Sequence, residues 1–187
     1  MSRPGLRVAL AVAIQFLLLL GLLGFKQYTL LTGETVLLQV QPIDPRDLFR
    51  GDYVTLSYDI STLRPDQLAG DDYFGPDARI YVELVKGDPY WRPVAIYRGH
   101  RQEHEPSVVL KGRVGSGSYW GGGSGSSSLR VKYGTEDIFI PEDTGRAVES
   151  LSRTGGRLGV EVVVDRWGNG IARHLILDGE PYKFERR

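Results

Sequence analysis

The chain begins with a long apolar run and continues with short segments in which apolar and polar residues alternate. Residues 8–25 are all apolar apart from Gln15 and two glycines. Eighteen helical residues rising about 1.5 Å each span about 27 Å, close to the hydrocarbon thickness of a bilayer. A soluble helix usually keeps a polar stripe, whereas this run is apolar on all sides. The pattern therefore predicts one N-terminal transmembrane helix, with residues 8–25 in contact with the lipid bilayer.

The residues around this run favour an uncleaved anchor with a cytoplasmic amino terminus. No A-x-A-like cleavage site follows the run, and the chain has no cysteine that could carry a lipid. Arg3 and Arg7 precede the run whereas only Lys26 follows it closely, and positive charge marks the cytoplasmic side. We expect residues 1–27 to form the anchor, Tyr28 to lie at the outer interface, and the remaining chain to lie outside the cytoplasm.

From residue 35 onward the chain shows runs of strand length separated by turn residues. Over 53–60 one face carries only apolar side chains, at Val54, Leu56, Tyr58 and Ile60. The other expected strands are 35–41, 79–85, 93–98, 107–114, 129–133, 137–140, 158–165, 171–177 and 180–184. Residues 166–170 favour a hairpin turn, and 64–69 and 141–155 favour short helices. The pattern predicts a mainly β fold: a compact antiparallel β domain over 35–184 with one or two short helices.

Composition excludes several classes of function. Basic and acidic residues number 23 each, and three of the basic ones lie before residue 27, so the remaining chain is mildly acidic. Such a domain lacks the clustered cations that phosphate contacts need, and no nucleic-acid partner is expected. The absence of cysteine excludes disulfides and thiolate metal sites. The Gly/Ser-rich segment 115–128 lacks the lysine and helix of a phosphate-binding loop and indicates a surface loop.

The densest group of charges lies just before the 53–60 run, at Asp44, Arg46, Asp47, Arg50 and Asp52. Two arginines and three aspartates within nine residues favour a network of charge-assisted hydrogen bonds that holds this turn against the next strand. The alternative is an exposed recognition surface, either for a protein partner or for an anionic small ligand bound by Arg46 and Arg50.

The same region carries a resemblance to a known family. The eight residues that carry it are Gly51-Asp52-Tyr53-Val54-Thr55-Leu56-Ser57-Tyr58. They fit in full the pattern that names the GDYXXLXY protein family, and residues 42–47 resemble the lead-in to that motif. The resemblance implies a bacterial protein with an N-terminal hydrophobic segment and an extracytoplasmic domain, associated with a polytopic membrane protein. It brings no activity with it.

One further pattern has the residue order of a catalytic site. His100, Glu103 and His104 match the H-x-x-E-H order of inverted zinc peptidases. That chemistry needs the two imidazoles one turn apart on a helix, whereas strand-like runs on both sides and Pro106 favour a charged loop. A metal-dependent hydrolase using this loop is the enzymatic alternative, and a third ligand is not evident. His174 lies on an expected strand and has no evident partner.

These observations predict a non-catalytic accessory or interaction domain anchored in the bacterial inner (cytoplasmic) membrane. Its C-terminal domain is expected on the periplasmic or extracellular side. The expected partner is a polytopic membrane or envelope protein, with the segment 44–58 as scaffold or contact surface. No catalytic constellation, metal site or cofactor is expected.

Overall fold

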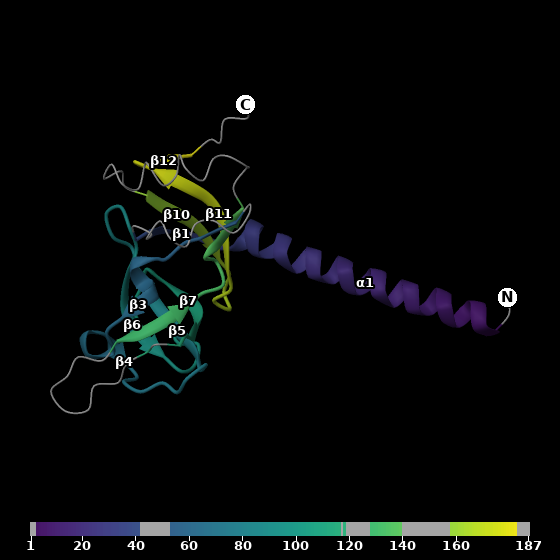
Figure 1. Cartoon of the computed structure of the whole chain (residues 1–187), viewed down its shortest axis with the longest axis horizontal. Coiled ribbons are helices and arrows are strands. Elements are labelled where there is room, and N and C mark those ends of the chain that lie inside the picture. The colour runs from purple at the N-terminus through teal and green to yellow at the C-terminus, as the bar shows by residue number, and fades with distance from the viewer. Residues whose placement is uncertain (1–2, 42–52, 117, 119–127, 140–157, 183–187) are drawn as a thin grey trace.

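The computed structural model describes residues 3–41, 53–116, 118, 128–139 and 158–182. Within these ranges the chain forms one long helix, two 3₁₀ turns and a series of strands (Figure 1). Their bounds are α1 Arg3–Thr32, β1 Glu34–Gln39, β2 Tyr53–Thr55, η2 Asp59–Ser61, β3 Thr62–Leu63, η3 Pro65–Gln67, β4 Ala69–Gly70, β5 Arg79–Val85, β6 Arg92–Tyr97, β7 Ser107–Val114, β8 Leu129–Lys132, β9 Asp137–Phe139, β10 Leu158–Val164, β11 Gly170–Leu177 and β12 Glu180–Pro181.

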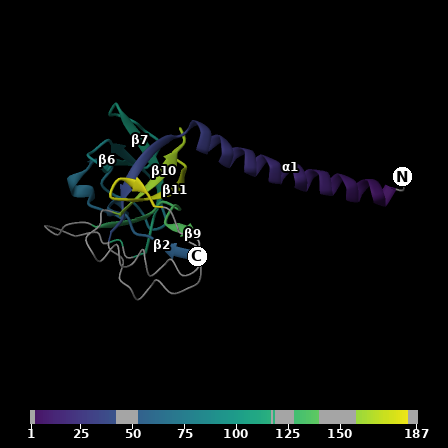
Figure 2. The same ribbon diagram turned by 90° about the horizontal axis from the view of Figure 1, so that it is seen from above.

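Helix α1 projects away from the rest of the molecule, and its carboxyl end lies beside β10 and β11 (Figure 1, Figure 2). Its 30 residues correspond to a length of about 45 Å. Its apolar side chains are exposed along the shaft, and the stretch Arg7–Thr32 is long and apolar enough to cross a membrane. The expected N-terminal apolar helix is thus confirmed, and it continues to Thr32, beyond residue 27.

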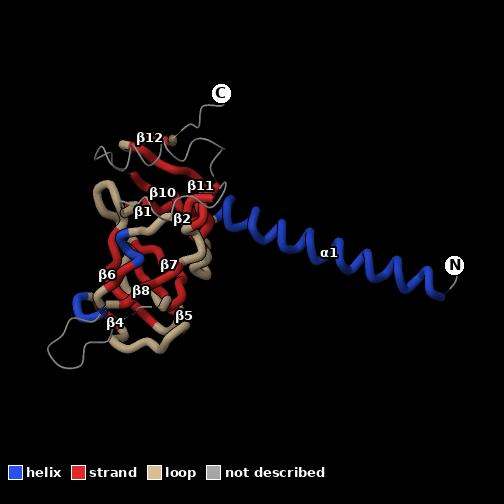
Figure 3. Tube along the Cα trace, in the orientation of Figure 1, coloured by secondary structure: helices blue, strands red, loops and turns tan. Residues whose placement is uncertain are grey.

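The strands form three sheets within the described residues (Figure 3). One has four strands in the order β1-β10-β11-β12, one has six in the order β3-β8-β7-β5-β6-β4, and β2 pairs separately with β9. Neighbouring strands run antiparallel, except that the two-residue β4 lies parallel to β6 at an edge. The predicted mainly β, antiparallel fold following one N-terminal helix is confirmed.

The two larger sheets contribute to one hydrophobic core. Val36 and Leu38 of β1 belong to the same buried cluster as Ile80 of β5 and Leu110 of β7. Strand β10 reads Leu-Gly-Val-Glu-Val-Val-Val, and every residue except Glu161 is buried. A strand buried on both faces gives a continuous apolar run instead of alternation, which explains its composition.

The run 53–60 is where prediction and structure differ most. Only β2 pairs as a strand, opposite β9, whereas Tyr58 forms an isolated bridge with Val40 and η2 follows as a 3₁₀ turn. The alternation of buried and exposed residues nevertheless holds from 55 to 60. The backbone is extended in β2 and again at Tyr58, while the chain passes from β9 toward the end of β1. Extended backbone keeps the two-residue period whichever strand it pairs with.

The predicted turns and shorter elements have mixed outcomes. Strands β10 and β11 form the expected hairpin, and β11 turns into β12 at Asp178 and Gly179, whose φ angles of 49° and 91° suit a tight hairpin turn. The expected helical turn within 64–69 is confirmed as η3. Strands β3 and β4 were not expected, because two residues carry no period of their own. The expected helix at 141–155 and most of the segment 115–128 lie outside the described residues.

Candidate functional site

The charged half of the motif lies outside the described residues: Asp44, Arg46, Asp47, Arg50, Gly51 and Asp52. The described half begins at Tyr53, whose backbone pairs with Phe139 of β9. Leu56 is 3% exposed and Tyr58 is fully buried, so both side chains belong to the core. The described half of the motif is therefore structural, whereas an anionic-ligand site at Arg46 and Arg50 stays a prediction.

Hydrogen bonds fix the described half of the motif to the segment before β9. The Leu56 amide donates to the Glu136 carbonyl at 2.8 Å, and the Tyr58 hydroxyl donates to the Thr135 carbonyl at 2.5 Å. Burial raises the pKa of the Tyr58 phenol well above its ordinary value, so the hydroxyl stays a neutral donor. Tyr58 thus acts as a buried hydrogen-bonding core residue and not as a surface contact.

The loop between β6 and β7 closes over a buried carboxylate. Glu83 of β5 is fully buried and accepts hydrogen bonds from the Glu103 amide (2.9 Å), the His104 amide (2.7 Å) and the Ser107 hydroxyl (2.7 Å). His104 Nδ1 lies 3.0 Å from its second oxygen. Burial raises the pKa of Glu83, but the hydrogen bonds from His104, Ser107 and the backbone outweigh it, and the pKa lies below its ordinary value. The Glu83 carboxylate thus binds the loop to β5 and to the first residue of β7.

The geometry of this loop differs from that of a zinc or hydrolase site. Residues 100–104 form no helix, so His100 and His104 do not share a helical face, and His104 is directed at Glu83. The Ser107 hydroxyl lies within hydrogen-bonding distance of the Glu83 carboxylate and the His104 carbonyl. An activated nucleophile would instead donate to an imidazole. In the part of the chain that the structure describes, no three His, Cys, Asp or Glu side chains are placed to hold a metal ion.

The expectation that His174 lacks a partner is wrong. A β-bulge between Glu161 and Val162 shifts the register of β10 against β11, so that Glu161 faces His174. His174 Nδ1 lies 2.7 Å from the Glu161 carboxylate. The bulge leaves Arg173 without a partner on β10 and breaks the two-residue period of β11, which explains the missed pair. Such surface pairs contribute about 0–1 kcal/mol to stability, so this one is a minor cross-strand contact.

The carboxyl end of α1 is built directly into the domain. The helix ends at Thr32 and β1 begins at Glu34, so only Gly33 lies between them. The Gly33 amide donates to the Thr29 carbonyl at 2.9 Å, and a Cβ at residue 33 would lie 2.6 Å from both the Thr29 carbonyl oxygen and a Val163 methyl group. Only glycine permits this close approach of the helix end to β10. The helix and the domain are therefore joined without a flexible linker.

Asp165, at the end of β10, ties the hairpin turn to the helix. It is 4% exposed, and its carboxylate accepts hydrogen bonds from Thr29 Oγ1 (3.1 Å), the Trp167 amide (2.9 Å), the Asn169 amide (2.8 Å) and Asn169 Nδ2 (2.9 Å). Burial raises the pKa of Asp165, but the donors from Asn169, Trp167 and Thr29 outweigh it, and the pKa lies below its ordinary value. One ionised carboxylate thus binds the helix end and the turn together.

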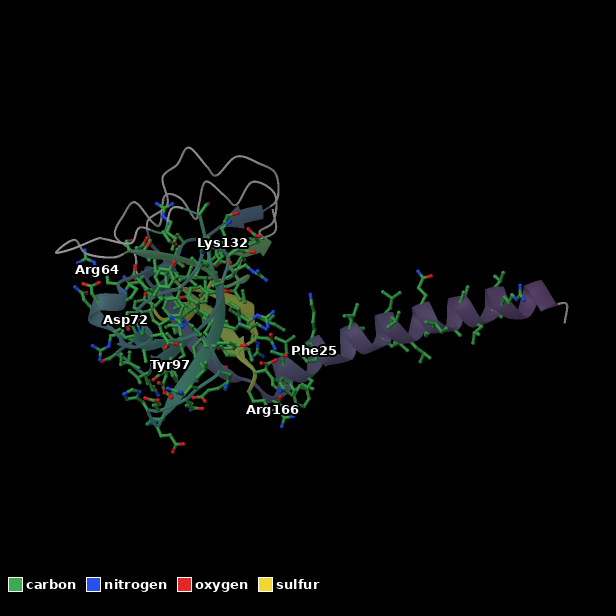
Figure 4. All side chains as sticks on the ribbon, turned by 90° about the horizontal axis from the view of Figure 1, so that it is seen from below. Phe25, Arg64, Asp72, Tyr97, Lys132 and Arg166 are labelled. Carbon is green, nitrogen blue, oxygen red and sulfur yellow. The ribbon has the colours of Figure 1, made fainter. Side chains whose placement is uncertain are left out.

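Aromatic packing completes the contact between the turn and the helix. The centroid of the Trp167 ring lies 5.9 Å from the ring centroids of both Phe25 and Tyr28, and the guanidinium of Arg166 lies 4.3 Å from the Trp167 centroid. Figure 4 shows Phe25 and Arg166 near each other where the helix meets the domain. Phe25, Tyr28 and Trp167 remain 48%, 40% and 42% exposed. The anchor junction, as we name it, consists of Phe25, Tyr28, Thr29, Gly33, Asp165, Arg166 and Trp167.

Comparison with known proteins assigns the chain to a family. A family model described as GDYXXLXY protein matches residues 15–175. The chain belongs to the GDYXXLXY family. The GDYXXLXY match begins inside α1 and ends in β11, so it includes the motif and both sides of the anchor junction. No curated protein and no solved structure matches this GDYXXLXY chain.

The anchor junction is the part of this GDYXXLXY chain that sequence reasoning missed. The available signals were Trp167 in an otherwise polar turn and aromatic residues at 25 and 28, which share a helix face. Nothing in the local pattern pairs that turn with the helix. They meet because β1 pairs with β10 in a register that sets Glu34 opposite Val164.

Proposed function

We propose that this protein is a non-catalytic, membrane-anchored module that docks on an integral membrane protein outside the cytoplasm. In this proposal α1 spans the cytoplasmic membrane of a bacterium and the β domain lies on the periplasmic or extracellular side. The observation that carries the proposal is the direct joint: an uncovered apolar helix passes into β1 across a single glycine and is bonded to the β10–β11 turn by Asp165.

The exposure of α1 supports insertion into a bilayer. The large apolar side chains from Val8 to Leu23 are between half and about seven-tenths exposed, and the described part of the domain does not cover them. Burying one large apolar side chain is worth about 1.5–3 kcal/mol, so a helix of this kind in water would carry a large cost that lipid removes. Arg3 and Arg7 before the apolar run and only Lys26 close behind it favour a cytoplasmic amino terminus.

Two features support a docking role: the direct joint between α1 and β1, and the fact that the polar side chains around Glu83 are already bonded within the domain. Because α1 enters the domain without a linker, a partner that binds the helix in the bilayer also orients the domain. The His104 and Ser107 side chains are engaged by Glu83, and Leu56 and Tyr58 of the motif are engaged by the core. The uncovered surfaces of the helix and the domain are therefore the parts that a partner can use.

Photocrosslinking in intact cells tests this proposal. A photoreactive residue replaces Leu18 in the middle of α1 in one variant and the exposed Ser57 of the motif in another, with the exposed Asp72 as a matched control position (Figure 4). We expect a discrete adduct with an integral membrane protein from Leu18 or Ser57 and none from Asp72. Absence of adducts from both, in protein that resists carbonate extraction, contradicts docking. Uncut protein in the soluble fraction contradicts the anchor itself.

A further inference from the structure

If α1 spans the bilayer, as in the proposed function on which this inference rests, the anchor junction has a defined depth. The apolar run of residues 8–25 fills about 27 Å of hydrocarbon, so Phe25 lies at its outer boundary and Tyr28 about 4.5 Å further along the axis. Trp167 contacts both rings. The turn of the β10–β11 hairpin therefore lies level with the lipid headgroups and not in bulk water.

The side chains of this turn have the chemistry of the membrane interface. Indole and phenol rings concentrate in the interfacial layer, where one edge is apolar and the other is hydrated. Trp167 is 42% exposed beside Phe25 and Tyr28, which extends the apolar surface of the helix sideways onto the domain. Leu31, one turn further on, is 75% exposed. This uncovered apolar surface continues from the membrane helix, so the lipid that surrounds the helix is the molecule placed to cover it.

Arg166 supplies a cation at the same level. Its guanidinium stacks on Trp167, and among the described residues no carboxylate forms an ion pair with it. The adjacent Asp165 is turned inward to its own donors. Arg166 also lines a cleft of about 260 Å³ at the end of the helix, and Glu34 lines it too. A zwitterionic headgroup carries a phosphate for the guanidinium and an ammonium for the carboxylate.

We propose that the turn between β10 and β11 is a second membrane contact of this protein, in which Trp167 lies in the interfacial layer and Arg166 binds the phosphate of zwitterionic phospholipid headgroups. The helix fixes the domain at one point, and the turn fixes it at a second. Together they set the tilt of the domain against the bilayer, so that a fixed face of the domain points away from the membrane.

Fluorescence quenching of the full chain in vesicles of phosphatidylethanolamine and phosphatidylcholine tests this contact. Trp167→Phe keeps an aromatic ring against Phe25 and Tyr28, and the difference between the wild type and this variant isolates the emission of Trp167. The quenchers are a lipid with a nitroxide on its headgroup, a lipid brominated near the middle of its chains, and acrylamide in the water. We expect the headgroup nitroxide to quench the Trp167 component at least about twofold more than either of the others.

Two matched variants make the measurement specific. Trp91 is buried in the core, so the component isolated with Trp91→Phe should not respond to either lipid quencher. Arg166→Gln keeps the indole but removes the guanidinium, which stacks on Trp167 and carries the proposed phosphate contact, and headgroup quenching of Trp167 should fall. Unchanged quenching in Arg166→Gln would overturn the phosphate contact.

Flotation of the same vesicles separates this inference from the proposal on which it rests. If the protein floats with the vesicles, and acrylamide quenches Trp167 while the headgroup nitroxide does not, the anchor stands and the second contact is refuted. If the protein fails to float, the membrane anchor is refuted, and the second contact with it.

Discussion

Replacing Asp165 with asparagine removes the charge at the centre of the anchor junction while keeping the size of the side chain. The carboxylate has two acceptor oxygens and four donor groups around it. An amide keeps one acceptor and presents two N–H groups in place of the other. If the side-chain oxygen of the new asparagine keeps its bonds from the backbone amides of Trp167 and Asn169, its side-chain nitrogen faces Asn169 Nδ2 and Thr29 Oγ1. Asn169 cannot turn its own amide around to compensate, because its oxygen already accepts from Lys111.

The expected cost follows from this count of bonds. The threonine hydroxyl can rotate to accept a bond. The substitution therefore loses one short charge-assisted hydrogen bond, that from Asn169 Nδ2 to Oδ2, and Nδ2 keeps only its longer contact of 3.2 Å with Oδ1. A hydrogen bond to a charged group is worth about 1.5–3 kcal/mol, and we expect Asp165→Asn to lower the free energy of unfolding by about that amount. For a domain of this size, where each kcal/mol corresponds to about 2–4 °C, the melting temperature should fall by about 3–12 °C.

Thermal unfolding of the full chain in detergent micelles, followed by circular dichroism at neutral pH, measures this change. Asp137→Asn is the matched control, because Asp137 is exposed and accepts one described hydrogen bond, from Thr55. It should change stability by less than about 0.5 kcal/mol. Melting temperatures that are equal for the two variants would refute the role given to Asp165.

The pH dependence of the same comparison has a definite sign. The pKa of Asp165 is lower in the folded protein than its ordinary value of about 3.9. Its contribution to stability is therefore fully present above that ordinary value and is lost as the pH falls through the folded pKa. The difference in stability between the wild type and Asp165→Asn should shrink in acid, and a difference that grows in acid would contradict an ionised carboxylate.

Leu56→Ala should lower the free energy of unfolding by about 2–5 kcal/mol in denaturant titrations, because the side chain is buried in the core. A change below about 1 kcal/mol would mean that the inward face of the motif is assigned wrongly. Glu83→Gln should cost about 1–3 kcal/mol at neutral pH, since a neutral amide oxygen replaces the charged acceptor of three hydrogen bonds. The pKa of Glu83 is lowered by folding, so its contribution is present above about pH 4.3 and is lost as the pH falls through the folded pKa. The variant should lose less stability in acid than the wild type, and equal losses would count against the bonds to Glu83.

Features that depend on local periodicity were predictable from the sequence. The apolar run gave α1, and alternation or continuous apolar runs gave β5, β7 and β10 close to their observed bounds. The inward face of the motif was also predictable, because the alternation at Leu56 and Tyr58 survives a change of pairing partner. In each case the residues that decide the outcome are neighbours in the chain.

Features that depend on residues distant in the chain were not predictable. Thr29 and Asp165 are 136 positions apart, and only the pairing of β1 with β10 brings them together. Glu83 lies on the face of β5 opposite Ile80, Val82 and Leu84, and it becomes buried because the β6–β7 loop folds over it. A single charged residue in a strand does not indicate which loop will supply its donors.

Because only one glycine separates α1 from β1, the length of the helix decides which way the domain faces around the helix axis. Because the anchor junction clamps the last helical turns to the hairpin, inserting one residue before Phe25 would leave that clamp intact. The insertion would rotate the whole domain by about 100° about the helix axis, relative to the part of the helix that precedes the insertion. It would also move the domain by about 1.5 Å along that axis. Two chains with identical domains, and anchors that differ by one residue, would therefore present different faces to the same neighbour in the bilayer.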